Sequence, residues 1–208
     1  MVRVFTNHND ICFTNNIFFN LQMQNNLLSN KRKSIIEIGN IVFWTATINN
    51  WNNLLYDDNY KEIIINSLTF INNKKKIDVY GFVIMPSHVH LIWRTNEMNG
   101  KETAQGSFLK YTAHQFKKLL LLENNEKILT FKVEAKNKKY EFWQRDPLAI
   151  NINSREIAFQ KLEYIHNNPL AKHWHLANNP SEYKYSSAKF YETGENNYSF
   201  LKDIRDII

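Results

Sequence analysis

The chain has 208 residues, which is enough for one domain with a substantial core. Its formal net charge of +6 is moderately basic and indicates an anionic partner without identifying it. The single cysteine excludes an intramolecular disulfide and a cluster of thiolate metal ligands. We expect a cytoplasmic protein with no membrane contact, because the sequence has no signal-peptide pattern and no apolar run near the about 20 residues that a membrane span needs.

The first 36 residues differ from the rest of the chain. They are rich in asparagine, show little hydrophobic periodicity and end near the basic run Lys31-Arg32-Lys33. This composition is typical of a poorly ordered extension ahead of a domain at residues 37–208. The alternative is a peripheral strand through residues 17–19.

A strand and a helix are predicted first after this segment. Residues 41–48 are β-branched and aromatic, which favours a strand. Asp57 or Asp58 can cap a helix over residues 60–71, where apolar side chains recur every three or four positions.

Two strands and a second helix follow. Residues 79–84 and 88–93 are apolar runs on either side of Met85-Pro86-Ser87, which indicates two strands joined by a tight turn. Residues 107–122 have helical spacing, and a strand at residues 140–144 would complete the order β-α-β-β-α-β. We therefore predict an α+β fold, a ferredoxin-like split β-α-β core with an antiparallel sheet and helices on one side.

The last third of the sequence predicts C-terminal helices. Ser154 precedes a helical pattern that ends at His166-Asn167-Asn168-Pro169. A further short helix is expected within residues 183–191.

The strongest candidate site is the pair His88 and His90. Residues two apart on a strand share a face, so both imidazoles project together and can hold a divalent metal. Such pairs also occur by chance on half-exposed strands. The apolar flanks favour a metal site, because two inward-facing histidines in such a strand need a reason to be there.

Several segments together resemble the REP-associated tyrosine transposases, a branch of the single-tyrosine HUH transposases of small insertion sequences. The resemblance spans about residues 38–192 and depends on these pieces in order: Met85-Pro86-Ser87-His88-Val89-His90-Leu91, Phe108-Leu109-Lys110, Phe142-Trp143-Gln144-Arg145, Tyr164-Ile165-His166-Asn167-Asn168-Pro169 and Tyr185-Ser186-Ser187-Ala188. It implies DNA transposition: binding of single-stranded or hairpin DNA ends, cleavage and rejoining by a tyrosine nucleophile with Mg²⁺ or Mn²⁺, and a dimer.

This chemistry needs both a metal and a nucleophile. A tyrosine hydroxyl has a pKa of about 10 and is a poor nucleophile at neutral pH, so a divalent ion that neutralises charge on the phosphate would help it. Two histidines leave the metal shell incomplete. Asp146, Asn151 and Gln144 are equal candidates for a third ligand.

The sequence departs from the family pattern at the nucleophile. Trp-Gln-Arg is normally followed within a few residues by the reactive tyrosine, but here Pro147 and Leu148 occupy those positions. Tyr140 and Tyr164 are alternative nucleophiles, although a strand edge and core packing would also explain them. The protein could instead bind DNA hairpins without cleaving them, or cleave them with a metal-bound water.

The DNA contacts are predicted from charge and aromaticity. Arg145 can bind phosphate and Trp143 can stack on a base, although Trp143 is as well explained by a place in the core. Lys110, Lys117 and Lys118 on the second helix are candidates for a DNA track. An RNA-binding domain of the RRM kind shares the element order, but its aromatic strand signature is missing.

Overall fold

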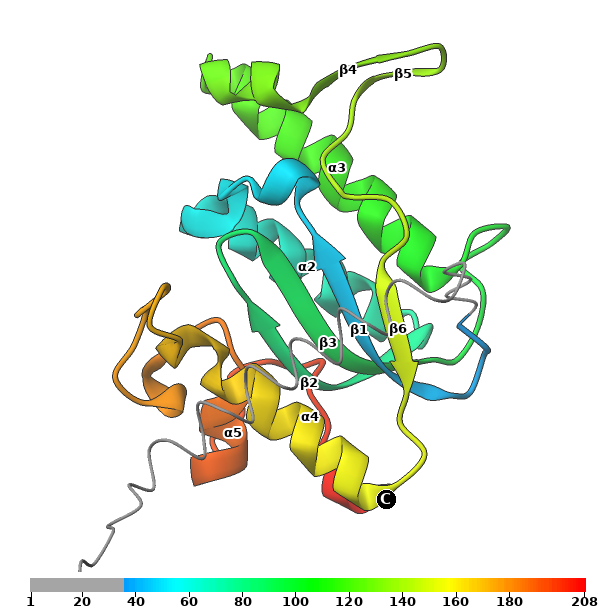
Figure 1. Cartoon of the computed structure of the whole chain (residues 1–208). Helices are drawn as coiled ribbons and strands as arrows, with labels where there is room; N and C mark the ends of the chain where they lie inside the picture. Colours follow the sequence, from blue (N-terminus) through cyan, green and yellow to red (C-terminus); the bar gives the residue numbers. More distant parts are fainter. Residues whose placement is uncertain (1–35) are drawn as a thin grey trace, which may run out of the picture. The chain divides into compact units, whose positions relative to one another are not determined.

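The computed structural model describes residues 36–208, drawn in colour in Figure 1. Chain contacts separate Met1–Lys33 from a second unit, Ser34–Ile208, which contains every described residue. The predicted N-terminal extension and its alternative, the peripheral strand, lie outside the described residues apart from Ile36. No helix within residues 36–208 has the length and apolar character needed to cross a membrane.

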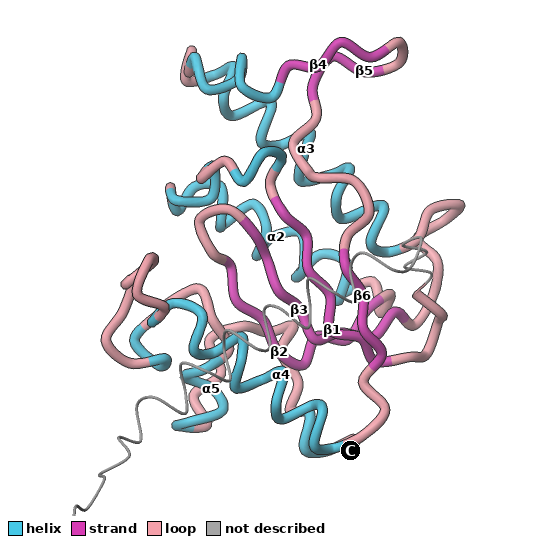
Figure 2. Tube along the Cα trace, in the orientation of Figure 1, coloured by secondary structure: helices cyan, strands magenta, loops and turns pink. Residues whose placement is uncertain are grey.

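The second unit is built on a four-stranded antiparallel sheet. Its strands are β1 (Ile41–Thr47), β2 (Ile77–Ile84), β3 (His88–Thr95) and β6 (Leu148–Asn151), in the order β2-β3-β1-β6 (Figures 1 and 2). This order, with helices between the first two strands and after the third, is the ferredoxin-like arrangement. The predicted fold class is confirmed.

Two long helices cover one face of the sheet. Helix α2 (Asp58–Asn73) begins after Asp57, whose side chain accepts a hydrogen bond from Asn59 N. Helix α3 (Ala104–Leu122) begins three residues before the predicted start, because Thr103 caps it through Gly106 N. Both helices turn their buried residues towards the sheet and towards each other.

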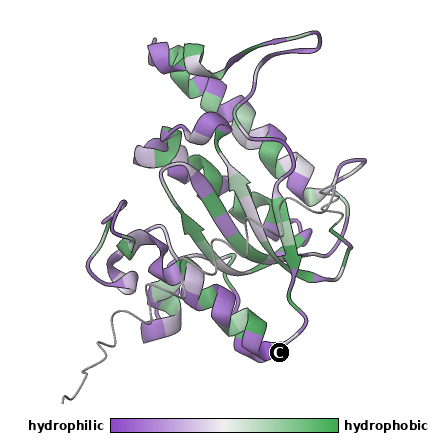
Figure 3. Ribbon diagram, viewed as in Figure 1, coloured by the Kyte–Doolittle hydropathy of each residue, from purple (hydrophilic) through white to green (hydrophobic). Residues whose placement is uncertain are grey.

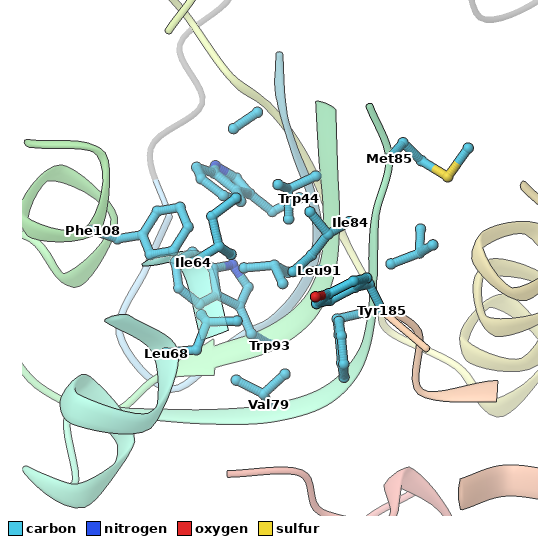
Figure 4. Packing of buried hydrophobic residues seen from close by; sticks show 14 of the residues in the cluster. Trp44, Ile64, Leu68, Val79, Ile84, Met85, Leu91, Trp93, Phe108 and Tyr185 are labelled. Atoms are coloured by element: carbon cyan, nitrogen blue, oxygen red, sulfur yellow. The ribbon is translucent and has the colours of Figure 1, made fainter. Parts of the chain in front are cut away.

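The core between these helices and the sheet is strongly aromatic (Figure 4). Trp44 of β1 and Trp93 of β3 lie with ring centroids 4.9 Å apart, and Phe108 of α3 meets both rings. Ile64 and Leu68 of α2 are fully buried in the same cluster. Burying such large rings supplies much of the hydrophobic free energy of the fold.

A third helix, the first of the predicted C-terminal helices, covers the opposite face of the sheet. Helix α4 (Arg155–Asn167), capped by Ser154, packs on β2 and β3. A Cβ at Gly81 would lie 2.7 Å from Leu162 Cδ2 and 3.1 Å from Ile165 Cδ1. The absence of a side chain at Gly81 thus lets α4 approach the strand closely.

The fourth strand is also not where the sequence predicted it. Residues 140–144 do not form the fourth strand. It is formed by β6, which begins four residues after residue 144. Instead β4 (Lys132–Ala135) and β5 (Lys138–Tyr140) form a separate hairpin, which is mostly hydrophilic in Figure 3. Phe142 stacks on Phe131 and belongs to the core, which explains why this aromatic segment had the composition of a strand.

The C-terminal segment closes the outer edge of β2. Ser186 forms a β-bridge with Val83, and Leu201 forms one with Val79. Ile84 N also donates a hydrogen bond to Tyr185 O at 2.9 Å. Helix α5 (Ala188–Thr193) lies between these two contacts and starts five residues after the predicted start. Short 3-10 helices complete the described chain at Asn49–Trp51, Leu54–Tyr56, Glu126–Phe131, Asn168–Leu170, Pro180–Glu182 and Ile204–Asp206.

Candidate metal and DNA site

The histidine pair lies at the start of β3, on the face of the sheet that α4 covers. His88 is opposite Thr47 of β1 and His90 is opposite Thr45. The two imidazole rings have centroids 4.7 Å apart and planes inclined by 70°. Strand alternation therefore brings both side chains together, as the sequence predicted.

Aromatic rings enclose the pair on both sides. Phe43 stacks on His90 at 5.3 Å, and Tyr164 of α4 meets the same imidazole edge-on at 5.4 Å. Trp51 and Trp174 lie beside His88, with ring centroids at 5.9 and 6.2 Å. His90 is thus the inner member of the pair and His88 the outer one.

Hydrogen bonds fix the two imidazoles through Nδ1. His90 Nδ1 lies 2.7 Å from Thr45 Oγ1, and His88 Nδ1 lies 3.2 Å from Ser87 Oγ. His90 Nε2 is buried and has no hydrogen-bond partner. When Nδ1 donates to Thr45, the unpartnered Nε2 carries a lone pair, which is the state of a histidine that binds a metal.

Burial keeps both imidazoles uncharged. It lowers the pKa of His88 to about 4, with a smaller effect from His173, and it lowers the pKa of His90 well below the usual value. Neutral imidazoles are the form that ligates divalent metals. The donor atoms present therefore fit the two histidine ligands of an Mg²⁺ or Mn²⁺ site.

The structure does not gather further metal ligands around His88 and His90 within residues 36–208. Within residues 36–208, no three histidine, cysteine, aspartate or glutamate side chains gather in a way that could hold a metal. Gln144 N donates to Thr47 O at 2.8 Å, and Trp143 forms a β-bridge with Ile48. Gln144 is thus the neighbour of Thr47, which shares a face with the histidines, so alternation places Gln144 on that face.

The two remaining candidates for a third ligand lie elsewhere. Asn151 pairs with Val42 of β1, and Val42 pairs with Trp93 of β3. Residues paired across neighbouring strands point to the same face of a sheet. Asn151 therefore lies on the face covered by α3, like Trp93. Asp146 lies in an exposed turn with φ 56°. Register thus favours Gln144 among the three candidates.

The two candidate nucleophiles are placed very differently. Tyr164 contacts both His90 and Phe43, and its ring lies 5.9 Å from that of Phe43. Tyr140 ends β5 on the α3 side of the sheet, with Lys117 Nζ 5.3 Å from its ring centroid. The structure brings only Tyr164 of these two to the histidine pair.

The candidate DNA contacts also separate. Trp143 is 7% exposed and its indole N–H donates to Thr112 Oγ1 at 2.9 Å, so the ring belongs to the core and is not presented to a base. Arg145 is exposed and pairs with Glu141 at 3.1 Å. Lys110, Lys117 and Lys118 lie on α3, which covers the face opposite the histidines, and Lys110 pairs with Glu102 at 2.6 Å.

Sequence reasoning missed several residues of the site. Thr45, Trp51 and Trp174 are brought to the histidines from β1, from the loop after β1 and from the loop after α4. The alternation of β1 could have indicated Thr45, because it shares a face with Phe43. No pattern in the sequence marks Trp51 or Trp174 as neighbours of His88.

Comparison with known proteins bears on the fold. Neither a family model nor a curated protein sequence matches the chain. A solved structure of a REP-associated tyrosine transposase bound to a REP hairpin matches with a TM-score of 0.56 and 17% identity, over 84% of this chain and 93% of that one. A second structure, provisionally described as a transposase from Deinococcus radiodurans R1, has a TM-score of 0.37 and 14% identity, over 67% and 97% of the two chains.

The first likeness extends over nearly all of the described chain. It confirms, at the level of the fold, the resemblance that the ordered motifs indicate. The unit of residues 36–208 therefore has the fold of a REP-associated tyrosine transposase.

Proposed function

We propose that this protein binds single-stranded or hairpin DNA ends and cleaves and rejoins them as a transposase does. The observation that carries the proposal is the His88/His90 pair, two neutral imidazoles on one strand with an unpartnered buried Nε2. A buried polar atom without a partner costs free energy, and a metal ion bound at His90 Nε2 would offset that cost. The transposase fold connects that ligand with DNA.

His88 and His90 would hold Mg²⁺ or Mn²⁺, and Gln144 is the side chain that register favours as an additional ligand. The bound ion would polarise the scissile phosphate and neutralise charge that develops on it. Thr45 and Ser87 hold the two imidazoles in position through Nδ1. The enclosing rings of Phe43 and Tyr164 limit the access of water to His90.

Tyr164 is the nucleophile we assign. Attack by its oxygen would form a bond to the phosphorus, release the phenol proton to solvent and break the bond between the phosphorus and the 3′ oxygen. The products would be a 5′-phosphotyrosine and a 3′ oxygen that takes up a proton to become a hydroxyl. Burial raises the pKa of Tyr164, so the hydroxyl is protonated at neutral pH and depends on the site for activation.

A hairpin-binding protein without cleavage activity is the second candidate. It is favoured by a specific observation: β6 begins at Leu148, so the two positions where the family has its nucleophile, Pro147 and Leu148, lie at the start of a strand of the sheet and carry no tyrosine. Cleavage by a metal-bound water, without a covalent intermediate, is the remaining route.

End-labelled hairpin DNA incubated with the protein and Mn²⁺ separates these alternatives. We expect a covalent protein–DNA product that is lost in His88→Ala and in Tyr164→Phe and retained in Tyr140→Phe. Cleavage without a covalent product would point to water as nucleophile. Binding without either product would leave the hairpin-binding function, and the absence of binding would refute both.

Two further properties belong to this proposal. We expect the protein to act in the cytoplasm and to form a dimer. Sedimentation of the protein alone and with hairpin DNA measures its oligomeric state, and a monomer under both conditions would refute the dimer.

A further inference from the structure

An exposed tryptophan lies at the mouth of the histidine site. Trp51 is 61% exposed, and its ring meets His88 edge-on with centroids 5.9 Å apart. Trp44 and Trp93, by contrast, are fully buried in the core. A single exposed apolar ring is common on protein surfaces, so the meaning of Trp51 depends on its position beside His88 and on its backbone.

The backbone at Trp51 has an unfavourable conformation. Asn50 and Trp51 both have φ of 55°, in the left-handed region. Asparagine tolerates that region, but a bulky residue such as tryptophan rarely adopts it. Strained positions of this kind persist when the surrounding structure enforces them, and they gather at binding and catalytic sites.

Hydrogen bonds to the site enforce the loop. Ile48 N donates to Ser87 O at 2.8 Å and Leu55 N donates to Pro86 O at 2.9 Å, which anchors both ends of the loop to the turn just before His88. Trp51 N donates to Ile48 O at 2.9 Å. The backbone of Trp51 is therefore held next to the turn that precedes His88.

We propose that Trp51 stacks on a nucleobase adjoining the phosphate held at His88 and His90. Aromatic side chains bind single-stranded nucleic acid in this way, because every base offers a π face. The inference rests on the proposed function. It adds a binding subsite for an unpaired base, and it gives the site a preference for single-stranded over fully paired DNA.

Binding of a fluorescein-labelled oligothymidine, measured by anisotropy with Mn²⁺ present, tests the stacking role. We expect Trp51→Ala and Trp51→Leu to bind about 5- to 100-fold more weakly, as loss of one stacked base does, and Trp51→Phe to retain most of the affinity. Phe70→Ala is the matched control, since Phe70 is an aromatic residue that is 60% exposed but lies on α2, which carries none of the candidate DNA contacts. Its affinity should be that of the wild type.

Abasic substitutions separate stacking from a structural role. Removing one base at a time from the oligothymidine should weaken binding to the wild type at one position and have no effect there on Trp51→Ala. Equal sensitivity of both proteins, or equal affinity of Trp51→Ala and wild type, would overturn the inference and leave the proposed function standing. Failure of the wild type to bind any DNA would instead refute the proposed function, and the inference with it.

Discussion

The two faces of β3 show how one strand serves both stability and chemistry. Leu91 and Trp93 point into the aromatic core under α2 and α3, whereas His88 and His90 point towards α4. Both sets of side chains are buried. Burial alone therefore does not distinguish a core residue from a site residue.

A buried polar atom without a hydrogen-bond partner separates a site residue from a core residue only when the apolar area of the same side chain is also considered. Trp93 Nε1 is buried without a partner, as is His90 Nε2. The indole offsets that cost with a large apolar ring, but an imidazole has little apolar surface to bury. His90 is therefore the residue whose burial folding alone does not explain.

The largest expected effect is on stability, and it should separate the two faces. Leu91→Ala removes a fully buried side chain, and we expect the free energy of unfolding to fall by about 2–5 kcal/mol. His90→Leu should cost less, about 1 kcal/mol, because it keeps a similar volume and removes the unpartnered Nε2 while losing the hydrogen bond between Nδ1 and Thr45 Oγ1. Urea unfolding measures both, and a larger loss in His90→Leu would contradict the comparison.

The α4 face should also make stability depend on pH. Burial lowers the pKa of His88 and of His166 to about 4, against about 6.5 when unfolded. The unfolded chain thus binds more protons between these values, so stability should fall from about pH 6.5 to about pH 4, by up to about 3 kcal/mol for each histidine. His166→Gln should flatten this slope, and an unchanged slope in urea unfolding between pH 4 and pH 6.5 would contradict the prediction.

An intermediate effect is expected from the hydroxyl that orients His90. Thr45→Val removes the partner of Nδ1, and removing such a hydrogen-bond partner typically weakens metal binding about 10- to 100-fold. Titration calorimetry with Mn²⁺ measures it. Thr47→Val, on the same strand and face, is the control and should bind Mn²⁺ as the wild type does.

The smallest effect should come from the α3 lysines. Neutralising Lys110, Lys117 and Lys118 to glutamine should weaken DNA binding and lower the salt slope by about 0.9 for each duplex phosphate that a lysine no longer neutralises. The cleavage rate at saturating DNA should not change, because these lysines lie across the sheet from the histidines. An unchanged salt slope would show that α3 makes no DNA track, with Lys189→Gln on α5 as control.

Much of the sheet could be predicted from the sequence because local patterns determine it. β1, β2 and β3 are long apolar runs, and the i, i+2 rule brings His88 and His90 to one face. The fourth strand was missed because β6 has only four residues, while the aromatic segment before it has the composition of a strand and packs as core.

The rest of the site depends on contacts distant in the sequence. Trp51 and Trp174 meet at His88 from two loops, and Tyr164 reaches His90 because α4 packs on the sheet face opposite α2 and α3, a placement that the sequence did not predict. Neither spacing nor composition encodes such meetings. The close approach of α4 at Gly81 is the feature that produces the last of them.

The closure of the β2 edge has a consequence for synthesis of the chain. Phe82 N donates a hydrogen bond to Ser187 Oγ, and Ser187 lies 105 positions later in the chain. At about 5–20 residues per second, the ribosome delivers that residue roughly 5–20 s after the strand. During that interval the edge of β2 has unpaired backbone groups that can pair with another nascent chain. The sheet edge is thus completed only after Ser186, Ser187 and Leu201 have been synthesised and can pair with β2.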